Sequence, residues 1–309
     1  MVGEVGSHLE ADGSRTTALQ DPASSPQSSR VRLALRRASR LGRTLLNASP
    51  SPRSAGAPSL AGRPNRVACV IVAYNEADRI ERAVRSVAGL VDETLVVDSG
   101  STDETTAVCK RLGARVVHHP WSGFGPQKRF AEEVSSCDWI LSLDADEWLS
   151  DALRDELATL FAAPLPPTRC FRVHVRVVYP RRDAPAPFAH CHKYVRLYNR
   201  TTARFRASLT HDVVEATADV AWLKNDILHK SYRDFAHIVT KTIGYYQLQR
   251  EEGITPSRVA FLRLFTEFPF QFFKYYILRR HIFGGADGFA YATALAMGRW
   301  ARIFILKGW

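Results

Sequence analysis

Two carboxylates, Asp144 and Asp146, stand one residue apart directly after the apolar run of residues 139–143. At the end of a strand, such a pair can hold a divalent cation from one side and leave its other face open. Mg²⁺ suits this arrangement because it usually binds one or two carboxylates together with the phosphate oxygens of a substrate. The spacing therefore indicates a metal site at which these two carboxylates meet a phosphorylated ligand.

Two further groups of polar residues follow apolar runs earlier in the chain. Asp98 ends the run that begins at residue 93, and the first run is followed by Ala73, Tyr74, Asn75 and Glu76. Ligands of an open parallel sheet bind outside the carboxyl ends of its strands, so these polar ends are expected to converge. Together with the carboxylate pair they indicate a nucleotide-diphosphate site.

A glycine-containing segment, residues 123–129 (GFGPQKR), opens a predicted helix. Glycine lets the backbone approach a ligand closely, and Lys128 is available to phosphate oxygens. Each of these motifs has low specificity by itself, whereas their order and spacing together are much more specific. No GxGxxG motif follows the first strand, which counts against a dinucleotide-binding fold.

The motifs are carried by strands that alternate with helices. Short apolar runs at 67–73, 93–97, 114–118 and 139–143 predict strands, and the intervening segments 78–90, 102–112, 127–134 and 150–161 predict helices. This alternation is typical of an α/β fold with a doubly wound parallel sheet. Further strands are predicted at 171–179 and 193–198, and helices at 232–252, 257–268, 270–283 and 291–306.

Charge divides the chain into three parts. Residues 1–64 carry nine Arg against four acidic residues, and residues 256–309 carry eight Lys or Arg against two. The central part, 65–255, has 25 basic and 25 acidic residues. The basic excess thus lies in the two tails, and the neutral centre without a basic stripe argues against nucleic acid as a partner.

The two tails differ in composition. Residues 1–64 are rich in Ser, Pro, Ala, Gly and Arg, which predicts a disordered tail; the alternative for 31–46 is a basic amphipathic helix that forms on lipid. Residues 256–309 mix aromatic and basic residues, which favours an anionic membrane surface as partner; a core-packing helix pair with a solvated basic face is the alternative. No apolar run reaches the roughly 18 residues of a spanning helix.

The compartment is indicated by two absences in the sequence. The N-terminus lacks the charged start and apolar stretch of a secretory signal. The five cysteines are widely and irregularly spaced without a CxxC motif, which indicates a reducing compartment and no structural zinc site. We therefore expect a cytoplasmic protein, peripheral on the inner face of the cytoplasmic membrane.

The motifs VACVIVAYNEADRI, LVVDSGSTDET and WILSLDADEWLS resemble the nucleotide-binding half of family 2 glycosyltransferases of the GT-A fold. GFGPQKRFA, the strand around residues 195–198, the segment 210–212, ILHKSY at 227–232 and the aromatic C-terminus are similar to the lipopolysaccharide core β-glucosyltransferase subgroup. The resemblance covers about residues 66–309. It implies a GT-A domain at 65–255, with a nucleotide-binding half (65–163) and an acceptor half (164–255), and a helical, amphipathic region at 256–309.

The resemblance also implies roles for individual residues. Ala73, Asn75 and Glu76 would line the nucleotide pocket with Tyr74 between them, and Asp98 would contact the base or ribose, although many relatives have a second Asp where this chain has Ser99. Asp144 would approach the ribose and the metal, and Asp146 would ligate Mg²⁺ or Mn²⁺ bridging the diphosphate. The metal would neutralise the leaving diphosphate as a Lewis acid. His229 would complete the metal shell, or else is a core or helix-start histidine.

The family inverts the anomeric carbon, so one carboxylate must take the proton of the acceptor hydroxyl. Asp212 is the predicted base, and Glu215 is the local alternative. Near this side, Arg196, Arg204 and Arg206 would hold phosphate on a lipid-linked acceptor, or else form a solvated basic face.

The expected activity is metal-dependent, inverting transfer of a hexose, glucose, from a nucleotide-diphosphate sugar to a lipid-linked saccharide such as lipopolysaccharide core, in cell-envelope biosynthesis. The alternatives are transfer to a polyprenyl phosphate and a non-enzymatic nucleotide-sugar-binding protein.

Overall fold

The computed structural model describes residues 62–208, 213–216, 219–251 and 260–308. The predicted disordered tail, with its lipid-binding alternative at 31–46, lies outside the described residues except for positions 62–64. The candidate base Asp212 lies outside them as well.

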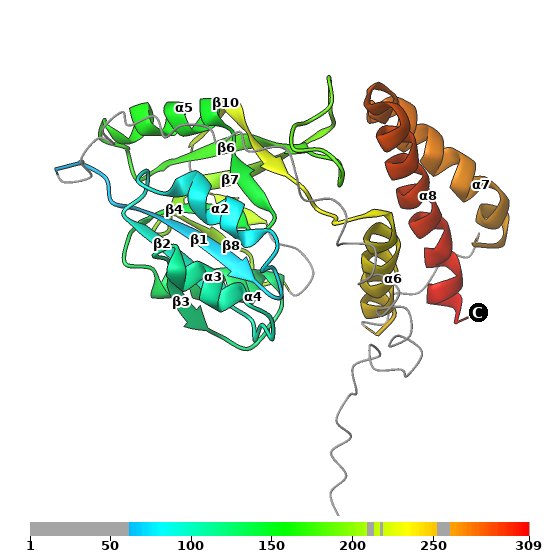
Figure 1. The fold of residues 1–309 in the computed structure, drawn as a ribbon, viewed down its shortest axis with the longest axis horizontal. Coiled ribbons are helices and arrows are strands. Elements are labelled where there is room, and N and C mark those ends of the chain that lie inside the picture. The colour runs from blue at the N-terminus through cyan, green and yellow to red at the C-terminus, as the bar shows by residue number, and fades with distance from the viewer. Residues whose placement is uncertain (1–61, 209–212, 217–218, 252–259, 309) are drawn as a thin grey trace, which may run out of the picture. The chain divides into compact units, whose positions relative to one another are not determined.

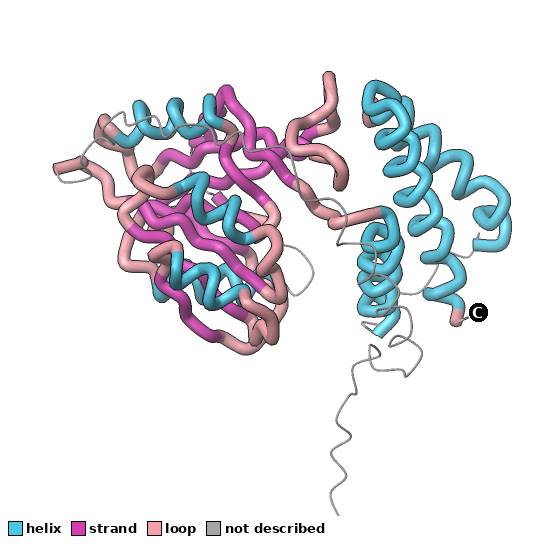
Figure 2. The backbone as a smooth tube through the Cα atoms, in the orientation of Figure 1, coloured by secondary structure: helices cyan, strands magenta, loops and turns pink. Residues whose placement is uncertain are grey.

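The described chain contains ten strands, seven α-helices and two short helical turns (Figures 1 and 2). The strands are β1 (Val67–Ala73), β2 (Glu93–Asp98), β3 (Arg115–His118), β4 (Trp139–Asp144), β5 (Glu147–Leu149), β6 (Arg169–Val177), β7 (Cys191–Asn199), β8 (Ala203–Phe205), β9 (Val214–Ala216) and β10 (Asp219–His229). The α-helices are α2 (Ile80–Val87), α3 (Thr105–Arg111), α4 (Phe124–Val134), α5 (Asp151–Phe161), α6 (Phe235–Glu251), α7 (Ala260–Phe273) and α8 (Gly285–Lys307). A π-helical turn (Lys274–Leu278) and a 3₁₀ turn (His281–Gly284) lie between α7 and α8.

Eight strands form one sheet in the order β3-β2-β1-β4-β7-β6-β10-β5. The first four strands, all predicted from apolar runs, are parallel to one another, with β1 between β2 and β4. β7 is antiparallel to both β4 and β6, and β5 is antiparallel to β10. The predicted α/β fold with a mostly parallel sheet, flanking helices and a helical C-terminal region is therefore confirmed, with antiparallel strands in its second half.

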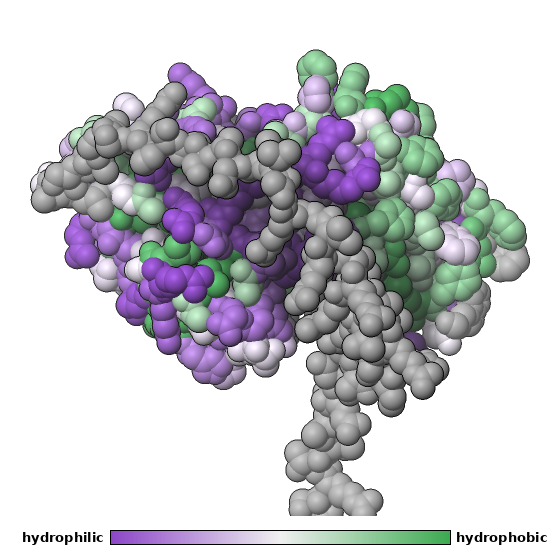
Figure 3. Space-filling view, in the orientation of Figure 1, coloured by the Kyte–Doolittle hydropathy of each residue, from purple (hydrophilic) through white to green (hydrophobic). Residues whose placement is uncertain are grey.

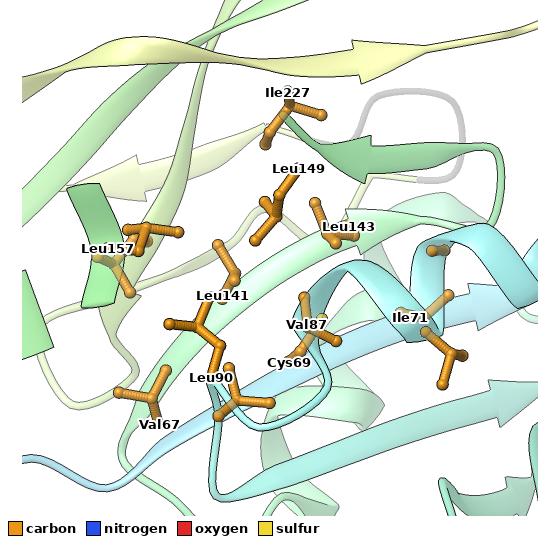
Figure 4. Packing of buried hydrophobic residues seen from close by; sticks show 14 of the residues in the cluster. Val67, Cys69, Ile71, Val87, Leu90, Leu141, Leu143, Leu149, Leu157 and Ile227 are labelled. Carbon is orange, nitrogen blue, oxygen red and sulfur yellow. The ribbon is translucent and has the colours of Figure 1, made fainter. Parts of the chain in front are cut away.

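The sheet separates two hydrophobic clusters, which explains the continuous apolar runs. One face packs against α2, α3 and α5, with Ile71, Leu141 and Leu143 of the strands meeting Val87 and Leu157 of the helices (Figure 4). The other face packs against α4 and the two-stranded sheet β8–β9. Because helices or strands cover both faces of β1, its side chains are apolar throughout instead of alternating.

Several predicted boundaries were wrong. The sequence pattern missed β10, because a bulge between Trp222 and Asp226 interrupts its alternation of apolar and polar residues. α7 continues through Pro269 instead of ending before it, and α8 begins six residues earlier than expected. The predicted helix at 150–161 is confirmed as α5, and Ser150 caps it, since its hydroxyl accepts from the backbone N–H of Leu153 at 3.2 Å.

The C-terminal helices pack against the end of β6 and the loop that follows it. Tyr179 and Ala186 share a hydrophobic cluster with Ile238 of α6 and Tyr291 of α8. The hydroxyl of Tyr179 and Nδ1 of the buried His281 share a hydrogen bond of 2.8 Å. Among the described residues, no helix is both long enough and apolar enough to span a membrane.

Glu132 of α4 is buried and ties this helix to β7 and β8, so its loss is expected to destabilise the fold. Its carboxylate accepts from the hydroxyl of Tyr198 at 2.7 Å and from the backbone N–H of Phe205 at 3.0 Å. Glu132→Ala leaves these donors without a partner, and we expect the free energy of unfolding in urea to fall by about 3 kcal/mol. Glu133→Ala removes a more exposed carboxylate from the same helix and is the control. Equal effects of both substitutions would contradict the role of Glu132.

Buried His281 is expected to make stability depend on pH. Burial, with smaller effects of His190 and Arg279, lowers the pKa of His281 from 6.5 to about 4. Between pH 6.5 and 4, the unfolded chain therefore binds a proton at this residue that the folded chain does not bind. The stabilisation that is present above pH 6.5 is lost as the pH falls toward 4. At pH 5 this group alone should cost about 1–2 kcal/mol relative to pH 7. Denaturation of His281→Asn at both pH values should show a smaller loss than the wild type, whereas exposed His118→Asn should not.

Candidate active site

A cavity of about 700 Å³ lies at the carboxyl ends of β1, β2 and β4. We call it the donor cavity. Its lining residues are Val72, Ala73, Tyr74, Glu76, Ser99, Trp121, Phe124, Lys128, Asp144, Ala145, Asp146, His229 and Lys241. It thus brings together seven of the predicted site residues, while Asn75 and Asp98 lie beside it in the adjoining turns.

Asp144, at the end of β4, is held between two cations. Nζ of Lys128 lies 2.7 Å from its Oδ1, and Nη2 of Arg196 lies 3.2 Å from its Oδ2. Burial favours the neutral carboxyl, but Lys128 and Arg196 outweigh it and hold the pKa of Asp144 well below its usual range. Asp144 is therefore ionised, and Lys128 reaches the cavity from the first turns of α4 as a buried side chain.

Glu147, which directly follows Asp146 in the sequence, contacts both Arg196 and the backbone of Asp144. It is buried, its Oε1 lies 2.6 Å from Nη2 of Arg196, and its Oε2 accepts the backbone N–H of Asp144 at 3.0 Å. Burial raises the pKa of Glu147, and Arg196 opposes that effect. The expectation that Arg196 binds an acceptor phosphate or lies on a solvated face was wrong, because the side chain is buried between these carboxylates.

Asp146 faces His229 from β10, the strand that sequence patterns missed. Nε2 of His229 lies 3.2 Å from Oδ1 of Asp146, and Nη1 of Arg79 lies 3.4 Å from Oδ2. Burial favours the neutral acid, but the charge and hydrogen bond of His229 lower the pKa of Asp146 to about 2. Burial lowers the pKa of His229, but the negative charges of Asp146, Glu147 and Asp144 raise it by more. The net shift of the pKa of His229 is therefore upward. The alternative of an ordinary core histidine therefore does not describe its surroundings.

The turn after β1 is built from contacts of its polar residues with the chain itself. Asn75 has a positive φ of 54°, its backbone N–H donates to Oγ of Ser101 at 2.9 Å, and its Oδ1 accepts the N–H of Thr102 at 2.9 Å. Glu76 accepts from Arg79 at 2.7 and 2.6 Å and from Arg233 at 3.0 Å. Burial, partly offset by Arg79, raises the pKa of Glu76. Asn75 therefore joins two loops, and Glu76 also lines the donor cavity.

Asp98 is buried at the end of β2. Its Oδ2 accepts the backbone N–H groups of Gly100 and Ser101, both at 3.0 Å. In the described part of the chain, its Oδ1 is buried without a hydrogen-bond partner. One oxygen of this carboxylate thus shapes the turn, and the other is buried beside it.

The sequence predicted that glycine would let the backbone approach a ligand, whereas Gly125 approaches the protein's own backbone. A Cβ atom on Gly125 would lie 2.0 Å from the backbone oxygen of Arg206 and 2.7 Å from the nitrogen of Ser208. Its own N–H donates to the oxygen of Ser208 at 2.9 Å. Only glycine fits here, because the first turn of α4 packs directly against the chain that leaves β8.

The donor cavity contains side chains of the kinds that bind metal ions. Within the described ranges, no group of three or more His, Cys, Asp or Glu side chains is arranged to enclose one. Asp146 and His229 are nevertheless neighbours, and Asp144 lines the same cavity. A cation held by one or two carboxylates takes its other ligands from substrate phosphates. The residues therefore fit Mg²⁺ or Mn²⁺ that binds together with a diphosphate, and their roles as ligands remain predictions.

A second cavity, of about 290 Å³, shares Asp144 and His229 with the donor cavity. We call it the side cavity. Its other lining residues are Glu147, Arg172, His192, Lys193, Tyr194, Val195, Arg196, Phe205, Val213 and Val214. Val213 follows directly on Asp212, so the candidate base adjoins this cavity in sequence. Glu215 lies in β9 and pairs with Arg206 at 3.1 Å, with both side chains mostly exposed.

Sequence reasoning missed three residues that the fold brings to the site. Lys241 of α6 lines the donor cavity and donates to the backbone oxygen of Ser231 at 3.3 Å. Arg79 pairs with Asp146, and Arg233 bonds the backbone oxygen of Asn75 at 2.9 Å. No local pattern marks these two residues, because Lys241 contacts a backbone oxygen outside its own helix and the partners of Arg233 lie 155 or more residues away in sequence. Arg79 stands three residues after Glu76, a spacing that indicates an ion pair on a helix.

Comparisons with known proteins show which family this chain is similar to. A family model, glycosyl transferase family 2, matches residues 68–228. An uncharacterized glycosyltransferase of Rickettsia felis is 36% identical over 253 residues, covering 78% of this chain and 89% of the relative. The lipopolysaccharide core biosynthesis glycosyltransferase LpsC of Rhizobium meliloti is 38% identical over 98 residues, or 30% of this chain and 36% of LpsC.

Among solved structures, glucosyl-3-phosphoglycerate synthase from Mycobacterium tuberculosis, in complex with Mn²⁺, uridine diphosphate and glucosyl-3-phosphoglycerate, is similar with a TM-score of 0.30 and 27% identity. That match covers 38% of this chain and 45% of the synthase. The family model spans more than half of the chain, and the Rickettsia relative matches over three quarters of it. The resemblance of the motifs is thereby confirmed: the chain belongs to glycosyl transferase family 2 and is a glycosyltransferase.

Proposed function

We propose that this glycosyltransferase moves a hexose, glucose, from a nucleotide-diphosphate sugar to a lipid-linked saccharide such as lipopolysaccharide core. The observation that carries the proposal is the donor cavity, where Asp144 and Asp146 meet Lys128, Lys241 and His229. This mixture of carboxylates and cations suits a diphosphate that brings a metal ion with it. The partial similarity to LpsC supports the choice of acceptor.

In the donor half, each charged group has a separate task. Asp146 and Asp144 would hold Mg²⁺ or Mn²⁺, which when bound supplies Lewis-acid neutralisation of the leaving diphosphate. Lys128 and Lys241 face the same cavity and stabilise the negative charge that develops on the leaving group. Trp121 and Phe124 form an edge-to-face pair at 4.9 Å on the cavity wall, where flat apolar surface suits a nucleoside base.

In the acceptor half, transfer with inversion requires a base opposite the leaving group. Asp212 remains our choice, because its neighbour Val213 lines the side cavity, which adjoins the donor cavity through Asp144 and His229. Glu215 is the alternative, although its ion pair with Arg206 occupies one of its oxygens. The base takes the proton of the acceptor hydroxyl as that oxygen attacks the anomeric carbon and the nucleoside diphosphate leaves.

We also propose that the protein works as a peripheral protein at the cytoplasmic face of the membrane. The helices α7 and α8 and the turns between them expose many large apolar side chains, which gather over this region in Figure 3. They are Phe265, Phe270, Phe273, Ile277, Leu278, Ile282, Phe283, Phe289, Met297 and Trp300. Residues 256–309 also carry eight basic against two acidic residues. Apolar side chains combined with positive charge suit an anionic lipid surface.

Asp146 provides the test of the proposed activity. The wild type is incubated with Mn²⁺ and a panel of nucleotide sugars, and release of nucleoside diphosphate is measured with and without a chelator. We expect one glucose donor to be consumed in a chelator-sensitive reaction. Asp146→Asn should lower that rate by about a hundredfold or more, because the metal loses a carboxylate ligand.

The control for this test is Asp183→Asn, since Asp183 is exposed, lies outside the donor cavity and pairs with Arg82 at 3.1 Å. It should keep the wild-type rate. Wild-type turnover by Asp146→Asn would contradict the metal role of Asp146. Chelator-resistant turnover would contradict metal dependence.

The membrane proposal predicts which vesicles retain the protein. Sedimentation with vesicles of phosphatidylcholine plus phosphatidylglycerol should retain the wild type, and pure phosphatidylcholine should retain less. The exposed pair Phe265→Ser and Phe270→Ser should each weaken retention about tenfold, because each removes roughly 1.5–3 kcal/mol of apolar burial. Phe235→Ser in α6 is the control. Retention that ignores both lipid charge and these substitutions would contradict the proposal.

A further inference from the structure

The side cavity contains positive charge that the reaction site does not use. Its two carboxylates are already compensated, Asp144 by Lys128 and Arg196, and Glu147 by Arg196. Arg172 and Lys193 also line it, and no carboxylate of a described residue lies within ion-pair distance of either. Burial, chiefly, lowers the pKa of His192 to about 4, so this ring is neutral near pH 7. Among the described residues, the charges of the cavity that have no carboxylate partner are therefore those of Arg172 and Lys193.

These two cations lie close to the ring of an exposed tryptophan, Trp222. The guanidinium carbon of Arg172 lies 5.3 Å from the ring centre of Trp222, and Nζ of Lys193 lies 5.6 Å from it. The ring of His174 stacks on Trp222 at 5.1 Å. Trp222 is nevertheless 46% exposed. A partly exposed aromatic ring beside two cations offers a ligand both apolar surface and positive charge.

The register of the strands explains why these residues share one face. Arg172 lies opposite both Val195 of β7 and Trp222 of β10, and His174 lies opposite Lys193. On β6, Arg172 and His174 alternate with Val173 and Val175, which belong to the hydrophobic cluster under α2 and α5. Successive side chains of a strand point to opposite faces, so Arg172 and His174 lie on the face away from those helices.

We propose that Arg172, Lys193 and Trp222 form a subsite for an acidic sugar residue of the acceptor, one that carries a carboxylate or a phosphate. This inference rests on the proposed function, because it names the acceptor class of the same site. Arginine and lysine bind the anionic substituent, arginine with a fork that matches two oxygens. The apolar C–H face of the sugar ring packs on the tryptophan. The subsite adjoins the donor cavity through Asp144 and His229, so the bound residue lies beside the position of the transferred sugar.

The test measures binding without any reaction. A ligand-observed NMR titration compares methyl glucoside, methyl glucuronide and methyl glucoside 6-phosphate, with inorganic phosphate as a fourth probe. We expect the wild type to bind at least one acidic glycoside about tenfold more tightly than the neutral one. The carboxylate and phosphate probes show which substituent the subsite takes.

Variants then assign the binding to the residues. Arg172→Gln and Lys193→Gln should each reduce the preference for the acidic glycoside about tenfold, and Trp222→Leu should weaken both acidic and neutral glycosides. Lys110→Gln removes an exposed charge from α3 and should bind as the wild type does. Binding of the nucleotide-sugar donor is measured on the same samples and should be unchanged in all four variants, which also shows that they are folded.

Three results would overturn the inference: equal binding of neutral and acidic glycosides by the wild type, wild-type preference in both Arg172→Gln and Lys193→Gln, or equal binding of inorganic phosphate and the phosphorylated glycoside. A wild type that does not bind the nucleotide-sugar donor would be a separate result. It would contradict the proposed function and leave the glycoside preference standing.

Discussion

Four charged side chains meet at the end of β4, the buried Lys128, Glu147 and Arg196 and the partly exposed Asp144, and the site depends on their mutual compensation. They come from α4, β4, β5 and β7, so the charges can be paired only when all four elements are in place. Burying one such charge alone costs several kcal/mol, and removing a single partner leaves that cost uncompensated. The network therefore works as a constraint on the sheet: it orients Asp144 and sets the direction in which the next residues, including Asp146, leave the strand.

The same principle extends to the C-terminal side of the donor cavity. The backbone oxygen of Asp146 accepts the N–H of Lys230 at 3.0 Å, and Arg79 donates to the backbone oxygen of Lys230 at 3.1 Å. Arg233 connects this segment to Asp78 at 2.7 Å. The carboxylate pair, the turn after β1 and the segment after β10 are thus tied into one polar network. A ligand that displaces one of these contacts will therefore change the geometry of the others, since they share partners.

The two cavities divide recognition by charge. The donor cavity mixes carboxylates with cations, as binding of a diphosphate together with a metal ion requires, while the side cavity adds Arg172 and Lys193, which lie beside the ring of Trp222 and have no carboxylate partner among the described residues. Asp144 and His229 belong to both cavities, which places the boundary between the proposed donor and acceptor at these residues. The apolar surface of α7 and α8 would add a third kind of recognition, for lipid, that uses neither cavity.

Local patterns in the sequence were enough to predict the parallel half of the fold and the positions of its polar strand ends. Apolar runs such as 67–73 and 139–143 are local signals, and in a parallel sheet Ala73, Asp98 and Asp144 must end at the same edge. The family could be inferred for the same reason, because its motifs are contiguous. Only the tertiary structure decided that Arg196 is buried between carboxylates, that His229 on the bulged β10 faces Asp146, and that Trp222 meets Arg172 and Lys193. These contacts join strands far apart in sequence, and their register depends on how the whole sheet pairs, which no local pattern of residues specifies.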